Sequence, residues 1–387
     1  MNIYADFNGS APLSDDVKEY LIHRIQNGPF ANPNAIHQVG ARTLMAMEKS
    51  RKLISDYLGA KPNQIIFNSG ATEGITNIFY TFTRPEVLNS GKKHIITSSI
   101  EHSAVLNETK RAKSLGFTTH YLPVNEDGIV EVEKLNELLG KYSNETALVS
   151  IMAANNETGV IQPIDQISKI CKEYSVPFFS DTTQYIGKTS FNFNELGLDY
   201  AVMSGHKIGA LTGCGFIIAK DPSTLECLIL GGGQEKGRRG GTQNYLGNES
   251  IAVALKSIHD NFDKIGQLAN KRAEFENKIK TDFPNVVILG DKAPRLASTT
   301  YIAFPGIHGQ GVQIELESKG IFVTTSSACS DNEPVTSKVL KAMNVSDDIG
   351  RGVVRISLCL CSNLSDYDKI YDALKETYIK LGKLKSF

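Results

Sequence analysis

The chain has 387 residues, 41% of them hydrophobic and 21% charged, which is enough for two domains or for one large domain with an appendage. Its formal net charge is −1 and it has no long basic tract, so nothing in the composition indicates binding to nucleic acid or to a membrane surface. Apolar runs are short, and we identify no signal peptide, transit peptide or transmembrane helix. We therefore expect a cytoplasmic protein.

The six cysteines give no indication of a disulfide framework or a zinc site, because they are widely spaced and include no CxxC pair. Hence we expect no metal ligands. Cys359 and Cys361 stand two apart in a run typical of a strand, where packing in the core is the favoured interpretation. This usage of cysteine fits a reducing cytosol.

Two amphipathic helices are predicted near the N-terminus, at residues 14–28 and at about 38–58. In the first, Ser14 is the predicted N-cap and Gly28 follows the last turn. Two irregular stretches, residues 4–12 and 30–37, are too polar for a core and too apolar for a disordered segment. Loops of this composition often line a site.

From residue 64 onwards, short apolar runs alternate with helical segments, which predicts a mainly parallel sheet. Ligands of such sheets bind beyond the carboxyl ends of the strands, where this chain places polar residues. The expected strands are residues 64–67, 94–97, 147–152, 176–179, 200–203 and 214–219.

The turn after residues 200–203 contains a lysine suited to carbonyl chemistry. The apolar run ends abruptly in Ser204-Gly205-His206-Lys207. An amine at the end of a buried strand can be desolvated until part of it is neutral, and it can then form a Schiff base. The alternative is a surface lysine on a turn, and the polar residues at the other strand ends favour the reactive lysine.

Each of the other strand ends has two interpretations. Gly70-Ala71-Thr72 begins a helix whose free N–H groups suit a phosphate, or it is a plain helix start. Asp181 could hold the proton of a pyridinium nitrogen, or form a turn. Gln184 and Asn155 could donate to a phenolate oxygen, or be ordinary loop amides. His102 could stack on a flat ring and shuttle protons, or cap a helix.

A glycine-rich loop with two arginines, residues 231–244, could approach an anion closely or be a flexible surface loop. After it, a long helix over about 248–281 is predicted to connect to a second domain. That domain has expected strands at 286–289, 299–304, 321–323 and 353–358, and expected helices near 309–319, 334–343 and 364–382.

Two residues of the second domain suggest chemistry. Cys329 lies in a loop of small polar residues, where a thiol is exposed and mobile as a nucleophile must be. Arg355 lies among β-branched residues in a predicted strand, so it needs an anionic partner. That partner is either a substrate carboxylate or an internal carboxylate.

The order and spacing of these motifs resemble the fold-type I pyridoxal-phosphate enzymes, and within them the class V group that contains the cysteine desulfurases. The Ser-Ala-Cys loop is closer to the NifS/IscS-like branch than to the SufS-like branch. The likeness covers nearly the whole chain and rests on Tyr4-Ala5-Asp6, Ser69-Gly70-Ala71-Thr72-Glu73, Glu101-His102, Asn155-Asn156-Glu157-Thr158-Gly159, Asp181-Thr182-Thr183-Gln184, Ser204-Gly205-His206-Lys207, Arg238-Arg239-Gly240-Gly241-Thr242, Ser327-Ala328-Cys329 and Arg355-Ile356-Ser357-Leu358.

The resemblance implies an α/β fold: a large cofactor domain, residues 14–259, with a mainly parallel seven-stranded sheet, and a smaller α/β domain formed by residues 1–13 and 260–387. Lys207 would bind pyridoxal 5'-phosphate covalently, Asp181 would pair with its ring nitrogen, and His102 would stack on the ring. Gln184 and Asn155 would bind the ring oxygen. The phosphate would be held by Ala71, Thr72, Ser204, His206 and, from the neighbouring subunit of a homodimer, Thr242.

The same resemblance implies the reaction. Arg355, with Asn34 and Asn155, would bind L-cysteine, and Cys329 would take its sulfur as a persulfide while alanine leaves. An acceptor or scaffold protein would then receive the sulfur, for iron–sulfur clusters, tRNA thiolation or DNA phosphorothioation. Alternatives that keep the cofactor are a class V aminotransferase and a selenocysteine lyase. A further alternative is a degenerate paralogue that serves as a scaffold.

Three departures from the family pattern bear on activity. Residues 208–213 lack the usual tyrosine and proline, which would soften the turn after Lys207. Thr182 replaces the usual alanine near the ring. Thr325-Ser326-Ser327 replaces Ser-Gly-Ser, and the stretch from Cys329 to Glu333 is shorter than is typical. A shorter loop would reduce the reach of the thiol.

Overall fold

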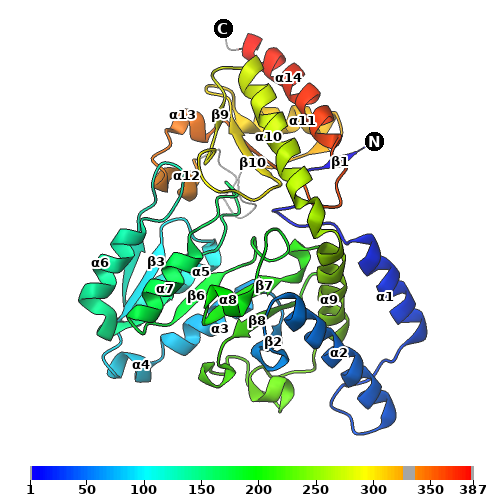
Figure 1. Ribbon diagram of the computed structural model, residues 1–387, viewed down its shortest axis with the longest axis vertical. Coiled ribbons are helices and arrows are strands. Elements are labelled where there is room, and N and C mark those ends of the chain that lie inside the picture. Colours follow the sequence, from blue (N-terminus) through cyan, green and yellow to red (C-terminus); the bar gives the residue numbers. More distant parts are fainter. Residues whose placement is uncertain (1, 326–335, 385–387) are drawn as a thin grey trace.

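A seven-stranded sheet organises the larger part of the chain in the computed structural model, which describes residues 2–325 and 336–384 (Figure 1). Its strand order is β2-β8-β7-β6-β5-β3-β4. β8 runs antiparallel to β2 and β7, and the other pairs are parallel, as predicted. The strands are β2 (Ile65–Asn68), β3 (His94–Ser98), β4 (Thr118–Leu122), β5 (Thr146–Ser150), β6 (Phe178–Asp181), β7 (Tyr200–Ser204) and β8 (Gly215–Ala219).

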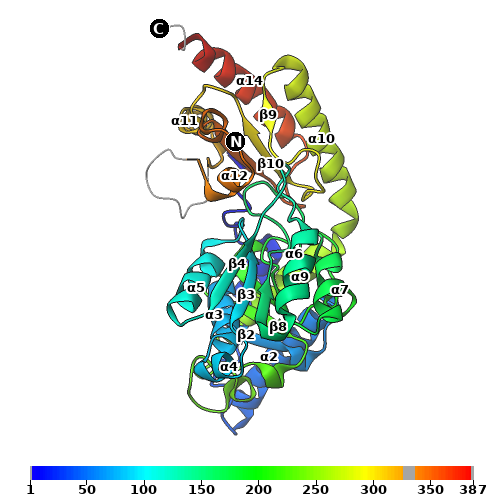
Figure 2. The same ribbon diagram turned by 90° about the vertical axis from the view of Figure 1, so that its left-hand side faces the viewer.

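Helices cover both faces of this sheet (Figure 2), which is why its central strands are continuous apolar runs. α3 (Ala71–Phe82) and α5 (Ser103–Ser114) pack on one face, against alternate residues such as Ile95 and Val202. α6 (Val132–Tyr142) and α7 (Ile164–Glu173) pack on the other face, against the intervening residues such as Ile96 and Ala201.

The edge strand β4 was not among the expected strands. It has the sequence Thr-Thr-His-Tyr-Leu and pairs on one side only, with β3. Its first four residues are exposed or half-buried, so it lacks the apolar run by which the central strands can be recognised. Polar side chains on an edge strand discourage pairing with another chain.

The two N-terminal helices are confirmed as α1 (Asp15–Asn27) and α2 (Gln38–Tyr57), with Ser14 capping α1 by accepting from the N–H of Val17. Both pack against α9 (Tyr245–Asp260). A buried ion pair joins α1 to α9, with Arg24 Nε 2.8 Å from Glu249 Oε2.

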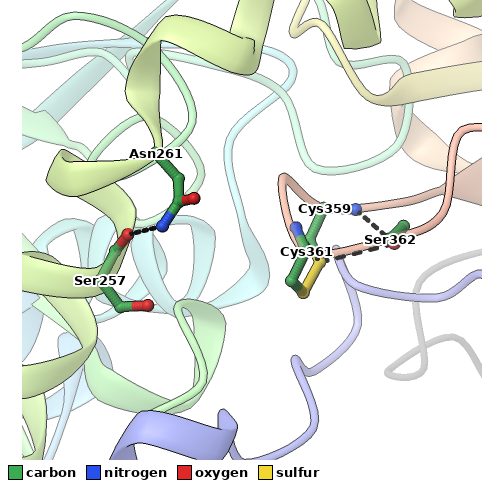
Figure 3. The surroundings of a disulfide bond; sticks show 5 residues. All are labelled: Ser257, Asn261, Cys359, Cys361 and Ser362. Carbon is green, nitrogen blue, oxygen red and sulfur yellow. Dashed lines mark hydrogen bonds between the residues drawn. A yellow bond between two sulfur atoms is a disulfide. The ribbon is translucent and has the colours of Figure 1, made fainter.

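The single long helix expected over 248–281 is wrong, because the structure has two helices there. α9 ends at Asp260, and α10 (Ile265–Asp282) begins after a 3₁₀ turn, Phe262–Lys264. The side chain of Asn261 donates to the carbonyl oxygen of Ser257 at 2.8 Å (Figure 3). A short amide side chain that competes for backbone groups in this way favours a helix end. α10 then continues into the smaller part of the molecule (Figure 1).

The smaller part is built on an antiparallel sheet of β9 (Val287–Ile288), β10 (Thr299–Ala303) and β12 (Val353–Ser357), with β10 in the middle. β1 (Ile3–Tyr4) pairs in parallel with β11 (Ile321–Phe322), which brings the N-terminus into this part. The remaining helices are α4 (Pro85–Asn89), α8 (Phe193–Leu196), α11 (Gly309–Ser318), α12 (Lys338–Ala342), α13 (Asp347–Gly350) and α14 (Asp366–Leu384).

The boundaries at residues 13/14 and 259/260 stay a prediction, and the packing supports them. One apolar cluster joins Ile3 and Ala5 to α10, α11, α14 and the small sheet. The turn between α9 and α10 lies close to the second predicted boundary. No helix within the described ranges is both long and apolar enough for a membrane span.

The prediction that Cys359 and Cys361 pack in the core is wrong, because they form a disulfide (Figure 3). β12 ends at Ser357, so both cysteines lie in the turn that leads to α14. The turn brings their Cα atoms within 5.3 Å, and Cys361 is exposed. The N–H of Cys359 donates to the hydroxyl of Ser362, which closes the turn.

Candidate functional site

Lys207 lies at the carboxyl end of β7, in the 3₁₀ turn Gly205–Lys207, and faces the N-terminal arm, residues 6–12. Its Nζ donates to the carbonyl oxygens of Asn8, at 3.0 Å, and Gly9, at 2.6 Å. The N–H of Ala11 donates to the carbonyl of His206, so the arm runs alongside this turn. The predicted reactive amine is therefore half-buried and held between a strand end and the arm.

The start of α3 adjoins the same turn. The N–H of Ala71 donates to Oγ of Ser204 at 2.7 Å, and no side chain caps the helix. Gly70 has φ +145°, and a Cβ on it would lie 3.1 Å from that Oγ. Thr72 is exposed beside it. Uncapped N–H groups at a helix start, with two hydroxyls and no Cβ at the entrance, fit a phosphate group.

Two ionisable side chains near this helix start, His206 and Glu73, do not oppose the binding of an anion there. Burial, with the nearby charges of Lys207 and Lys188, lowers the pKa of His206 to about 4, so its ring is neutral at pH 7 and can donate from one nitrogen. Glu73 pairs with Arg239, whose Nε lies 2.9 Å from its Oε1. The arginine thus balances the only carboxylate in the first turn of α3.

Asp181 is the last residue of β6, and His102 follows β3 as the N-cap of α5. Oδ1 of the buried Asp181 accepts from the N–H of Thr183 at 3.0 Å. His102 caps α5 by accepting from the N–H of Ala104 at its Nδ1, which places the proton of the neutral ring on Nε2. The capping interpretation of His102 is therefore confirmed, and its ring is half-buried. Stacking of this ring on a cofactor stays a prediction.

Glu101 is a buried acid next to these residues whose chemistry the sequence did not indicate. Its Oε1 accepts from the hydroxyl of Ser98, at 2.6 Å, and from the N–H of Met152, at 2.9 Å. Burial raises its pKa to about 8, and the charge of Asp181 acts in the same direction. At pH 7 the protonated form of Glu101 is therefore favoured.

The amides of Asn155 and Gln184 are both engaged by protein groups. Asn155 is fully buried, and its Oδ1 accepts from the N–H groups of Glu157 and Thr158 while its Nδ2 donates to Ile100 O. The bonds at Oδ1, within its own loop, fit the alternative considered for Asn155, an ordinary loop amide. Gln184 donates from Nε2 to the carbonyl oxygen of Asn8 at 2.8 Å, which places its N–H end on the same atom as Lys207 Nζ.

Arg355 has the internal carboxylate partner that was the alternative to a substrate. Its Nη2 lies 2.5 Å from Oδ1 of Asp6, and its Nη1 donates to the carbonyl oxygen of Asn156 at 2.8 Å. Among the residues that the structure describes, its buried Nε has no hydrogen-bond partner. A second anion could therefore still bind the guanidinium edge.

Within the described residues, no hydrogen bond or ion pair joins Asn34 or Thr242 to Arg355. The side chain of Asn34 donates to Asn32 and to Oε1 of Gln243, and Thr242 precedes that glutamine as an exposed residue. The structure thus brings Asn34 close to the glycine-rich loop, 231–244. Within one chain it does not bring Asn34 to the carboxylate-binding arginine.

Cys329 lies outside the described residues, but the start of its loop is placed. The N–H of Arg355 donates to the carbonyl oxygen of Thr324 at 2.6 Å. The hydroxyl of Tyr301 donates to the carbonyl oxygen of Thr325 at 3.1 Å. The loop therefore begins beside Arg355. In residues 2–325 and 336–384, no three His, Cys, Asp or Glu side chains are grouped as metal ligands would be.

The family model for Aminotransferase class-V matches residues 3–370. The chain belongs to this family. A cysteine desulfurase IscS from Dictyoglomus turgidum is 34% identical over 386 residues, which cover 100% of this chain and 96% of that protein. A cysteine desulfurase from Nostoc sp. is 33% identical, with 100% and 95% covered.

Solved structures agree with this assignment. A NifS-like protein has a TM-score of 0.89 at 33% identity and covers 98% of this chain and 100% of its own. SspA in complex with cysteine has a TM-score of 0.78 at 30% identity, with 92% and 98% covered. The resemblance to NifS- and IscS-like members of class V is confirmed, and so is the fold class.

Proposed function

We propose that this chain is a pyridoxal-phosphate-dependent cysteine desulfurase, which converts L-cysteine to L-alanine and carries the sulfur as a persulfide on Cys329. The observation that carries the proposal is the junction around the N-terminal arm. Asn8 and Gly9 hold the amine of Lys207, while Asp6 holds Arg355, whose backbone is bonded to the start of the Cys329 loop. An amine, a carboxylate-binding cation and a nucleophilic thiol are the three groups that this reaction needs.

The donors at the strand ends fit pyridoxal phosphate. Ala71, Thr72, Ser204 and His206 would hold its phosphate, Asp181 would hold the ring nitrogen, and His102 would lie on the ring. Gln184 would bind the ring oxygen with the N–H end of its amide. Asn155 could do so only by giving up an internal hydrogen bond. When bound, the cofactor supplies the electron sink that makes the substrate Cα acidic.

The side chains of this chain supply the proton and sulfur transfers. Lys207, oriented by two carbonyl oxygens, would remove the Cα proton of L-cysteine. The Cys329 thiolate would then attack the substrate sulfur, so that an S–S bond forms and the Cβ–S bond breaks. The electron pair of the broken bond stays with the carbon skeleton, which takes up protons and leaves as alanine.

Arg355 would bind the substrate carboxylate through the edge of its guanidinium that Asp6 and Asn156 leave open. We expect Arg355→Leu to raise KM for L-cysteine by roughly 50-fold or more, because a charge-assisted pair is lost. Cofactor binding should change little. Steady-state kinetics measures this, with Arg351→Leu, which removes an exposed pair with Asp347, as the matched control. An unchanged KM in Arg355→Leu would show that another group binds the carboxylate.

A homodimer with Thr242 contributing to the neighbouring site is part of the proposal. Large apolar side chains are exposed on α1, on α2 and on the loops near them, and Thr242 is exposed in the same region. Such a surface is typical of an interface. Sedimentation velocity would test it, and a purely monomeric protein would contradict it. These apolar residues are Ile22, Ile25, Phe30, Ile36, Val39, Met45, Ile229 and Leu230.

The reaction itself is tested with L-cysteine, pyridoxal phosphate and a thiol reductant. A desulfurase releases alanine and sulfide in equal amounts. An aminotransferase would form a keto acid without sulfide, and a selenocysteine lyase would act on selenocysteine far better than on cysteine. A scaffold paralogue would do none of these. We expect the protein to act in the cytoplasm and to pass its sulfur to an acceptor or scaffold protein.

A further inference from the structure

Lys188 is a basic residue of the site that no motif indicated. It follows Gln184 in an irregular turn, is half-buried, and directs its Nζ toward the N-terminal arm. Nζ donates to Oδ1 of Asn8 at 2.7 Å and also to Oε1 of Gln184. The side chain is therefore bonded to two of the residues that surround Lys207.

Asn8 has a hydrogen bond at every polar group, with only 1% of its surface exposed. Its carbonyl oxygen accepts from Lys207 and Gln184, and its N–H donates to the hydroxyl of Ser357. Its Nδ2 donates to Oγ1 of Thr299 at 3.0 Å and to a second carbonyl oxygen. The one remaining atom, Oδ1, is the atom that Lys188 holds.

We propose that Lys188 is a positioning residue, which orients the Gln184 amide toward the cofactor and holds Asn8 against Lys207. An amide has two ends of similar shape, and only the end with N–H groups can donate to an anionic ring oxygen. Lys188 offers donors only to Oε1 of Gln184, which leaves Nε2 on the side of Asn8 O and Lys207. This inference rests on the proposed function, because it concerns the same cofactor.

The charges around Lys188 agree with this role. Desolvation, followed by the positive charges of Lys207 and Arg355, holds the pKa of Lys188 well below its usual value, and Asp6 acts in the opposite direction. The two acceptors, Asn8 Oδ1 and Gln184 Oε1, each take one N–H of the amine. Because desolvation and the neighbouring cations disfavour its charged form, Lys188 adds less positive charge beside Lys207 than an exposed lysine would.

The test compares five proteins: the wild type, Lys188→Met, Gln184→Leu, the double variant, and Lys220→Met. Lys220 is a matched control, because it forms an exposed pair with Asp199. Each protein is stripped of cofactor and titrated with pyridoxal phosphate, and the affinity and the position of the visible absorption band are recorded. Thermal unfolding of the stripped proteins shows whether a variant is folded.

We expect Lys188→Met to weaken pyridoxal-phosphate binding about tenfold and to shift the band in the same direction as Gln184→Leu. The double variant should be within about twofold of Gln184→Leu, because Lys188 acts through that amide. Lys188→Gln, which keeps two N–H donors on a shorter chain, should lie between Lys188→Met and the wild type. Lys188→Gln also replaces Lys188→Met in the comparison if the methionine variant does not fold.

The inference is overturned if the losses of pyridoxal-phosphate affinity in Lys188→Met and Gln184→Leu add fully in the double variant. It is also overturned if Lys188→Met has the affinity and the absorption band of the wild type. A lower unfolding temperature with an unchanged band would make Lys188 a structural residue only. If the wild type itself gains no visible band, the proposed cofactor is wrong and the inference fails with it. A wild-type band therefore separates failure of the inference from failure of the function.

Discussion

Replacing Cys329 with serine is expected to lower alanine and sulfide release from L-cysteine by roughly 10³-fold or more, with the cofactor still bound. A hydroxyl has neither the polarisable sulfur nor the accessible anion that attack on a sulfur atom needs. The residues proposed to hold the cofactor lie at the strand ends of the large sheet, so a change at position 329, between β11 and α12, should leave the absorption band intact.

Cys227 is the matched control for this change. It is a half-buried free thiol outside the site, and its Sγ donates to the carbonyl oxygen of Ile229. Cys227→Ser should keep wild-type turnover. Mass spectrometry after one turnover should find the extra sulfur on Cys329 in the wild type. Equal turnover in Cys329→Ser and the wild type would rule out the persulfide mechanism and favour a lyase or an aminotransferase.

Lys207→Ala is expected to abolish turnover, again by roughly 10³-fold or more, and to remove covalent attachment of the cofactor. The carbonyl oxygen of Gly9 would lose the donor Lys207, and that of Asn8 would keep only Gln184. Borohydride treatment of the loaded protein, followed by peptide mass mapping, measures the attachment directly.

The mapping also decides between two neighbouring lysines. Label on Lys207 in the wild type, with none in Lys207→Ala, is the expected result. Label on Lys188 would show that the attachment site has been assigned to the wrong lysine. Lys220→Ala, which removes an exposed pair with Asp199 just past the end of β8, should behave as the wild type in both the attachment and the turnover measurements.

The central strands and the residues at their carboxyl ends could be predicted because their signals are local. β5 and β7 are buried throughout and therefore apolar without interruption, and the polar turn after each run is visible in the sequence. Asp181 ends β6, and Lys207 stands in the turn that follows β7. β4 lies at the sheet edge, half-exposed, so it has no comparable signal.

The partners of the site residues could not be predicted in this way. Asp6 and its partner Arg355 are 349 residues apart in the sequence, and Asn8 and its partner Lys188 are 180 residues apart. The sequence was consistent with a substrate carboxylate or an internal carboxylate as the partner of Arg355. Only the packing of the N-terminal arm beside β12 shows that Arg355 binds Asp6. The cap on His102, by contrast, is a contact with Ala104 two residues away, and capping was one of its two sequence interpretations.

The sequence by itself therefore determined the α/β class, the strand ends where polar residues gather, and Lys207 as the candidate reactive lysine, because burial and turn formation act over a few residues. Only the tertiary structure decided the break between α9 and α10, the Cys359–Cys361 pairing, and the network in which Asn8 and Lys188 hold Gln184 and Lys207. These features require atoms from distant segments to meet at hydrogen-bond or covalent distance. These contacts form only when the N-terminal arm, the large sheet and the smaller part pack together.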